Sequence, residues 1–430
     1  MLDRTTPPLI QPVSLAFRKP TKHILRNGIP VHIIEASGLG AVRIDFVFSA
    51  GQYHQVRSLQ AAFACRMLRE GCRGYTAAEF AERLDYYGAW LELNTAMNRT
   101  FVTLYTLKKH FSATMELVQR MLTEPTYSEE PFRTVCNNNK SCLLINLQKG
   151  NIIAMRTLRH SIYGDVHPCG TQTQPEDYDT LQVADIIDFY QRYYGSRTCQ
   201  IYLSGEVDDT LLSCVEPLFG NEEWGVQGME HGKIVEEIHY PDINNLHSSS
   251  HNIQLKGAVQ DSISMGCLLM DVNSPDYLSM RVLTAVLGGY FGSRLMKNIR
   301  EEKGYTYHIG SDLVTNTPQA MFLIHCEAQT GKSEEIIGEI HREIHRLQTE
   351  LIPDDELRMV RNYMVGETCR NYESTFALAD AYIFLDHLGL PLTHLENTVN
   401  TIHTTDASRL QQLAQQYLHP EKLHRVVVHS

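Results

Sequence analysis

The chain has 430 residues, of which 43% are hydrophobic and 20% charged, and its formal net charge is −12 at pH 7. This composition is that of a globular protein and excludes a disordered or collagen-like chain. The excess of acidic residues argues against nucleic-acid binding, which needs a clustered positive field. Two domains are expected at this length, because one core seldom grows beyond about 250–300 residues.

The first twenty residues carry an early acid, several prolines and no apolar core, so they do not resemble a secretory signal. No stretch approaches the ~18 apolar residues that a membrane helix needs. The ten cysteines contain no Cys-x-x-Cys pair. Without an export signal, we interpret them as reduced, mostly buried thiols. These features predict a cytoplasmic protein that does not act at a membrane.

Alternating and helical hydrophobic patterns predict a regular order of elements in the first half. In chain order these are a strand, two helices, two strands and a helix: 41–51, 58–71, 76–88, 89–98, 100–107 and 110–122. Gly88 is a natural C-cap for the second helix. Ser128, followed by acidic residues, is an expected N-cap for a further helix.

The second half repeats this order. Its predicted strand, two helices, two strands and two helices are 262–272, 276–289, 294–304, 305–316, 319–328, 332–347 and a last long helix from 353. Equivalent residues recur at an offset near half the chain, as in Gly71/Gly288 and Gly88/Gly304, which indicates an internal duplication. We therefore predict an α+β fold of two homologous domains, 1–225 and 226–430, each a mostly antiparallel sheet packed with helices.

The most specific pattern is LGGYFGSRLMKNIREEKGYTYHIGSDL, residues 287–313. It resembles the C-terminal signature of the M16 peptidases, the family of the mitochondrial processing peptidases and insulin-degrading enzymes. The matching residues are Gly288, Gly289, Ser293, Arg294, Leu295, Ile299, Arg300, Glu301, Gly304 and Tyr307. The resemblance extends to the duplicated order of elements and implies that family's fold over nearly the whole chain.

The resemblance also implies where a zinc site would lie. Active members carry His-x-x-Glu-His on the helix that matches 58–71, with two zinc ligands and a general base. Counting back from Gly71 places these positions at Ala62, Cys65 and Arg66, so both histidines and the base are missing. A further Glu ligand is expected some seventy-odd residues on, yet residues 131–164 contain no Asp or Glu.

Arg66 would oppose a metal at this place. A fixed cation ~4 Å from Zn²⁺ repels it by about 8 kcal/mol at an effective dielectric constant of about 20. We therefore expect no metal in this chain. Cys65 could act as a nucleophile or an unusual ligand, but a free cysteine on an apolar helix is more often a small core residue.

The second half retains Arg300 and Tyr307. In active family members this pair is thought to hold the substrate carbonyl and the developing oxyanion, as a guanidinium and a phenol are suited to do. The resemblance implies an accessory subunit of a two-chain, zinc-dependent endopeptidase, with zinc in a homologous partner. The subunit would form a heterodimer with that homologue, or a homodimer. Alternatively, Arg300 is a leftover in a surface salt bridge and Tyr307 a residue of the sheet.

Two other functions stay open: a peptide-binding or structural scaffold without peptidase activity, and an autonomous metalloenzyme with unconventional ligands such as Cys65 or scattered histidines. His341 and His345, four residues apart, are interpreted as part of an exposed charged helix face. His247 and His251 are interpreted as an incidental polar loop in the linker. These other functions and histidine sites have no motif that supports them.

Gly288 and Gly289 could form a binding loop. We favour a structural role for both, because glycine allows the chain to turn and to approach a neighbour closely.

Overall fold

The computed structural model describes residues 15–225, 248–315 and 317–430. Its first sheet has six strands in the order β1-β2-β8-β3-β7-β6. The strands are β1 (Thr21–Ile24), β2 (Pro30–Glu35), β3 (Ala41–Phe48), β6 (Trp90–Thr95), β7 (Thr100–Leu107) and β8 (Cys199–Gly205). Every neighbouring pair is antiparallel except β2 and β8, which are parallel.

The second sheet has five strands in the order β11-β12-β10-β13-β9. They are β9 (Ser250–Gln254), β10 (Asp261–Asp271), β11 (Thr306–Val314), β12 (Gln319–Ala328) and β13 (His424–His429). This is the order of the first sheet from β6 to β2, and the equivalent pair β9 and β13 is again parallel. The predicted α+β class, with two homologous and mostly antiparallel sheets, is confirmed. The predicted boundary at 225/226 borders residues 226–247, which lie outside the described residues, and stays a prediction.

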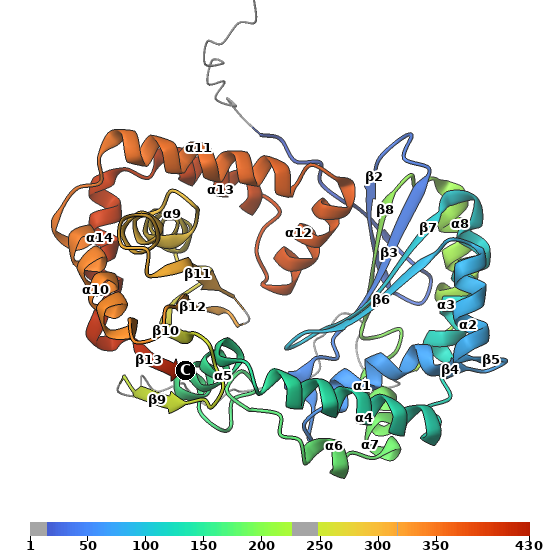
Figure 1. Ribbon diagram of the computed structural model, residues 1–430. Coiled ribbons are helices and arrows are strands. Elements are labelled where there is room, and N and C mark those ends of the chain that lie inside the picture. Colours follow the sequence, from blue (N-terminus) through green and yellow to red (C-terminus); the bar gives the residue numbers. More distant parts are fainter. Residues whose placement is uncertain (1–14, 226–247, 316) are drawn as a thin grey trace, which may run out of the picture.

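Helices cover the outer face of the first sheet (Figure 1). The described helices and short strands of this half are η1 (Gln52–His54), α1 (Gln60–Arg66), η2 (Met67–Glu70), β4 (Gly71–Cys72), β5 (Tyr75–Thr76), α2 (Ala77–Tyr86), η3 (Lys108–His110), α3 (Phe111–Thr123), α4 (Glu129–Asn146), α5 (Gly150–Tyr163), α6 (Asp177–Thr180), α7 (Val183–Tyr193), α8 (Asp209–Val215) and η4 (Glu216–Gly220). The predicted helix 58–71 is thus shorter and ends as a 3₁₀ turn. Thr76 caps α2 in a capping box with Glu79. Ser128 occupies the N-cap of α4 as predicted, but its side chain makes no capping hydrogen bond.

The second half adds α9 (Tyr277–Gly288), η5 (Met296–Glu302), α10 (Ser333–Thr349), α11 (Asp354–Asn371), α12 (Thr375–His387), α13 (His394–Thr404), α14 (Ala407–Tyr417) and η6 (Pro420–Lys422). The predicted helix 294–304 is η5, a π-helical segment that ends just before Gly304. Such segments are rare and occur often at functional sites. Among the described helices, none is long and apolar enough to cross a membrane.

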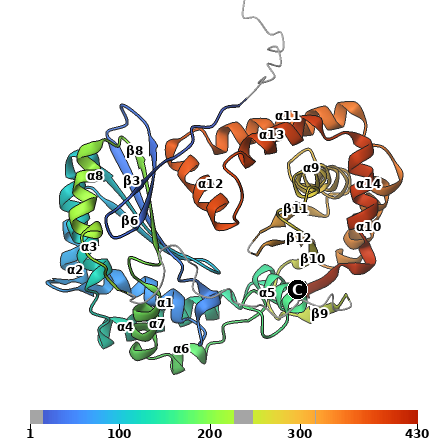
Figure 2. The same cartoon turned by 180° about the vertical axis from the view of Figure 1, so that it is seen from behind.

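The two halves exchange helices. α5, from the first half, packs on β10 and β13, whereas α12, from the second half, packs on β8 and β2. Figures 1 and 2 show both crossings from opposite sides. A separate apolar cluster joins Tyr53 and Leu158 of the first half to Met321 and Val426 of the second sheet. The chain is therefore one interlocked unit rather than two independent lobes.

Ion pairs fasten the exchanged helix α12. Arg43, a buried residue of the first sheet, pairs with Asp380. The Arg99 guanidinium lies 3.0 Å from the carboxylate of Asp386, and the Arg99 side chain is 8% exposed. Arg43 also pairs with the buried Asp45, whereas Arg99 pairs with Asp386 alone among the described residues, so losing Asp386 would leave a buried guanidinium uncompensated in the interface.

Candidate functional site

In α1, the three positions that the family resemblance assigns to zinc binding hold side chains that pack against or contact other parts of the chain. Cys65 is 1% exposed, and burial raises the pKa of its thiol to about 11. It is a protonated core thiol at neutral pH, as expected for a small core residue. Ala62 offers no ligand atom.

Arg66 makes its own contacts at this place. Its guanidinium donates a hydrogen bond to Oδ1 of Asn139 on α4 and lies 5.8 Å from the ring centroid of Phe63. Asn139 also comes seventy-odd residues after the motif, where the resemblance expects the third ligand. An Arg–Asn contact thus bridges α1 and α4, and these residues do not fit a zinc ion. Within the described ranges, no group of three His, Cys, Asp or Glu could hold a metal.

The second half brings Arg300 and Tyr307 into one pocket of about 900 Å³. Arg300 comes from η5 and Tyr307 from the start of β11. Gln260 and Thr330 belong to the loops that complete the wall, and Glu301 is the one carboxylate among the lining residues that the structure describes. The two residues that the sequence singles out therefore share a solvent-accessible pocket; their roles in it stay a prediction.

The hydrogen-bond donors of Arg300 and Tyr307 are free to bind a ligand, as far as the described residues are concerned. Within the described residues, the Arg300 guanidinium forms no ion pair or hydrogen bond, and its close contact is the ring of Phe291, 4.4 Å from Cζ to the centroid. Tyr307 is 86% exposed. The alternative in which Arg300 belongs to a surface salt bridge is therefore not what the structure shows.

A β-bulge turns Tyr307 out of the sheet. In the pairing of β11 with β12, Thr306 lies opposite Ala328 and His308 opposite Glu327, so Tyr307 is an extra residue without a partner. The Thr306 hydroxyl oxygen accepts a hydrogen bond of 3.0 Å from the backbone N–H of His308. Bulges re-aim side chains and are frequent beside active sites.

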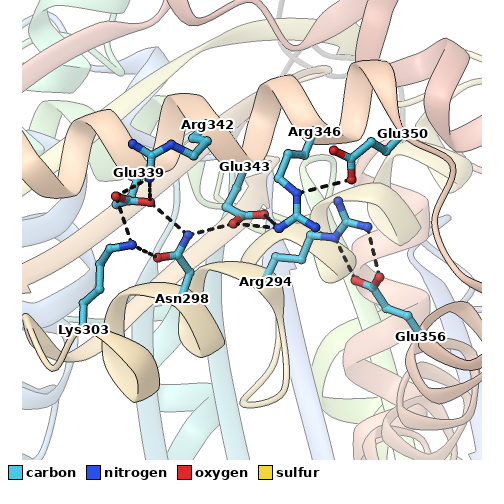
Figure 3. A network of polar contacts seen from close by, with 9 residues as sticks. All are labelled: Arg294, Asn298, Lys303, Glu339, Arg342, Glu343, Arg346, Glu350 and Glu356. Carbon is cyan, nitrogen blue, oxygen red and sulfur yellow. Dashed lines mark hydrogen bonds and ion pairs between the residues drawn. The ribbon is translucent and has the colours of Figure 1, made fainter.

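A polar network holds the segment that carries Arg300 (Figure 3). Asn298 donates hydrogen bonds to Glu339 (3.1 Å) and Glu343 (2.7 Å), and the Lys303 ammonium lies 3.0 Å from Glu339. Both carboxylates belong to α10, and both are buried. The network fixes η5 on α10, so the backbone of Arg300 has a rigid base.

The histidine interpretations hold in part. On α10, His345 is exposed as expected and His341 is partly buried, while the buried Glu343 lies on the opposite side of the helix, where Asn298 donates it a hydrogen bond. His251 is not in an incidental loop: it lies in β9, and its Nε2 is 3.0 Å from Oγ of Ser161 on α5. His247 lies outside the described residues.

Sequence reasoning missed two features. Phe291, beside Arg300, is 63% exposed, and an aromatic residue in a glycine-rich loop was the available signal. A second cavity of about 360 Å³ lies between α12 and the first sheet. Residues from both halves line it, among them Arg43, Phe101, Asp380, Phe384 and His387. No local sequence pattern marks this cavity, because the helix exchange creates it.

Residues 180–364 match the family model of the Peptidase M16 inactive domain. An uncharacterized zinc protease, YmxG, of Bacillus subtilis is 21% identical over 399 residues, which are 92% of this chain and 95% of that protein. A non-peptidase homolog, YmxG, of Helicobacter pylori is 24% identical over 351 residues, 78% of this chain and 76% of that protein.

Solved structures share the fold. The peptidase M16 inactive domain from Pseudomonas fluorescens superposes with a TM-score of 0.83 at 19% identity, covering 95% of this chain and 98% of that one. The periplasmic protease PqqL from Escherichia coli gives a TM-score of 0.75 at 14% identity, and the superposition covers 100% of this chain and 49% of the PqqL chain.

Proposed function

The chain belongs to the M16 peptidase family, and from this membership we propose that it is the zinc-less subunit of a two-chain peptidase. It binds peptide and presents Arg300 and Tyr307 to a zinc-bearing homologue. The observation that carries the proposal is a contrast. The α1 positions hold an alanine, a buried thiol and a paired arginine, whereas the Arg300 guanidinium has no polar partner among the described residues and shares a pocket with Tyr307.

The chemistry of the pocket suits a carbonyl group that acquires negative charge. The guanidinium is an obligate cation with five N–H donors, and the phenol adds an O–H donor. Donors that are already in place stabilise such a charge without reorganisation. Zinc, which would activate the attacking water, would come from the partner. This chain contributes orientation and charge stabilisation, as a heterodimer subunit in the cytoplasm.

The test is peptide cleavage by this chain mixed with a zinc-bearing homologue. Replacing Arg300 by Ala is expected to lower kcat by about 10²-fold, the usual loss when one oxyanion donor is removed. Tyr307→Phe removes only the O–H donor and is expected to have a smaller effect. Arg83→Ala, an exposed arginine on α2, is the matched control. If Arg300→Ala cleaves as fast as the wild type, the complementation proposal is wrong.

A second candidate function is a peptide-binding or structural scaffold without peptidase activity. The relative from Helicobacter pylori described as a non-peptidase homolog favours it. A homodimer that is stable in light scattering, together with no cleavage in the presence of zinc-bearing homologues, would select this function over the first.

A further inference from the structure

The Arg300 pocket is suited to an anion as well as to a carbonyl. We propose that it binds the C-terminal carboxylate of a peptide, with the Arg300 guanidinium held in place by Phe291. This inference rests on the proposed function, because it uses the same pocket, and it specifies the ligand. It applies to the chain on its own, without zinc or a partner.

The charge balance of the pocket favours a carboxylate. Among the described residues that line it, Arg300 is the one cation. Glu301 also lines the pocket, but it forms no ion pair with Arg300 within 4 Å, although both residues are described. A guanidinium without a counter-ion binds a planar carboxylate through two parallel hydrogen bonds, which are stronger than bonds to a neutral carbonyl.

Phe291 orients the guanidinium. The 4.4 Å distance from Cζ to the ring centroid places the ring against the guanidinium, as in cation–π contacts. Because the ring occupies a face of the guanidinium, its N–H edge stays free for a ligand.

The loop that carries Phe291 is built to hold it. Tyr290 stacks on Tyr363 of α11 with ring centroids 4.9 Å apart. A Cβ at Gly292 would lie 2.8 Å from the ring of Tyr290, and one at Gly288 would lie 2.6 Å from the backbone N of Ser311. These glycines permit close approach, the structural role expected for Gly288. The loop is therefore anchored through Tyr290, the residue directly before Phe291.

Other donors surround the position of a bound carboxylate. Tyr307 presents its phenol, and Gln260 and Gln329 line the same pocket with amide groups. A peptide that ends at Arg300 could thus bond through its terminal oxygens to Arg300 and Tyr307. Its preceding residues would then leave the pocket toward solvent.

The experiment uses the full chain alone and an N-terminally fluorescent peptide made in two forms, with a free C-terminal carboxylate and with a C-terminal amide. Fluorescence anisotropy gives both Kd values. The amide is expected to bind at least about tenfold more weakly, because a charge-assisted pair is lost. Arg300→Ala is expected to bring the acid form down to the affinity of the amide.

The role of Phe291 is tested in the same assay. Phe291→Ala is expected to weaken binding of the acid form, and Phe291→Tyr, which keeps an aromatic ring, is expected to restore it. Phe384→Ala, a partly exposed phenylalanine on α12 that lines a different cavity, is the control. Thermal unfolding of each variant shows that it is folded.

Each outcome separates the two proposals. Equal affinity for acid and amide, with both weakened by Arg300→Ala, overturns the carboxylate inference and leaves a carbonyl contact in place. No effect of Arg300→Ala on either peptide overturns the peptide contact of the proposed function as well. Unchanged binding by Phe291→Ala overturns the positioning role alone.

Discussion

The Arg294 guanidinium donates two hydrogen bonds, of 2.9 and 3.0 Å, to the two carboxylate oxygens of Glu356. The side chains are 8% and 19% exposed, so the pair is nearly buried. It fastens the chain just before η5 to the first turn of α11 (Figure 3). Arg294 of the family signature is therefore a structural residue, whereas Arg300, six residues later, faces the pocket.

Removing one partner of this pair leaves a buried charge. We expect Arg294→Ala to lower the free energy of unfolding by about 3–5 kcal/mol. The double variant Arg294→Met/Glu356→Leu, which removes both charges, is expected to recover much of that loss. Urea unfolding at pH 7 measures both. A loss below about 1 kcal/mol for Arg294→Ala would show that the pair is effectively solvated.

The contact of Arg66 with Asn139 predicts how a zinc site could be restored. The triple variant Ala62→His/Arg66→His/Asn139→Glu places two histidines four residues apart on α1 and a carboxylate on α4. It is expected to bind one zinc ion, whereas Arg66→His alone is expected to bind none tightly. Elemental analysis after dialysis is the measurement. A triple variant without zinc would mean that residue 139 is not placed as the third ligand.

The burial of His167 leads us to expect that the protein loses stability in acid. The side chain is 2% exposed, and burial lowers its pKa to about 4. Its Nδ1 accepts the backbone N–H of Cys169 at 3.1 Å, which requires an unprotonated Nδ1. Between pH 6.5 and 4 the unfolded state binds the extra proton and the folded state does not, so stability falls as the pH falls through this window.

The expected loss from His167 is up to about 3 kcal/mol across that window. His167→Asn carries no titrating ring, so its urea-unfolding free energy is expected to change less between pH 7 and 4.5. Other buried histidines contribute equally to both proteins, and the difference between the two slopes isolates His167. Parallel slopes would show that folding does not change the pKa of His167.

The ion pair between Arg99 and Asp386 is expected to limit the opening of α12. Because its guanidinium pairs with Asp386 across the halves, we expect Arg99→Ala to accelerate hydrogen exchange in residues 375–387. Asp386 is 38% exposed and can be resolvated, so the helix is expected to loosen rather than unfold. Arg83→Ala serves again as control. If hydrogen exchange accelerates only around residue 99 and not in residues 375–387, apolar contacts alone hold α12 in place.

The sequence predicted what local patterns determine. The strands 262–272 and 319–328 appear within a residue of their expected ends, because alternation and length specify them. The assignment of Ala62, Cys65 and Arg66 needed only a count from Gly71. Arg300 and Tyr307, which line one pocket, were identified from the motif at residues 287–313.

What the sequence could not predict depends on partners distant along the chain. The bulge at Tyr307 exists only in the pairing of β11 with β12. No pattern in the sequence marks Glu343 as a buried charge, and its burial depends on the hydrogen bond that Asn298 of η5 donates to it. The sequences of α5 and α12 do not show that these helices cross to the opposite half, because an apolar helix face can pack on either sheet.

The exchange of α5 and α12 has a consequence for how the molecule melts. Each sheet is completed by a segment encoded in the opposite half, so neither half contains a finished core of its own. Calorimetry is expected to give one cooperative transition in place of two. The two halves produced as separate polypeptides are expected to become soluble only when they are made together, as complementing fragments.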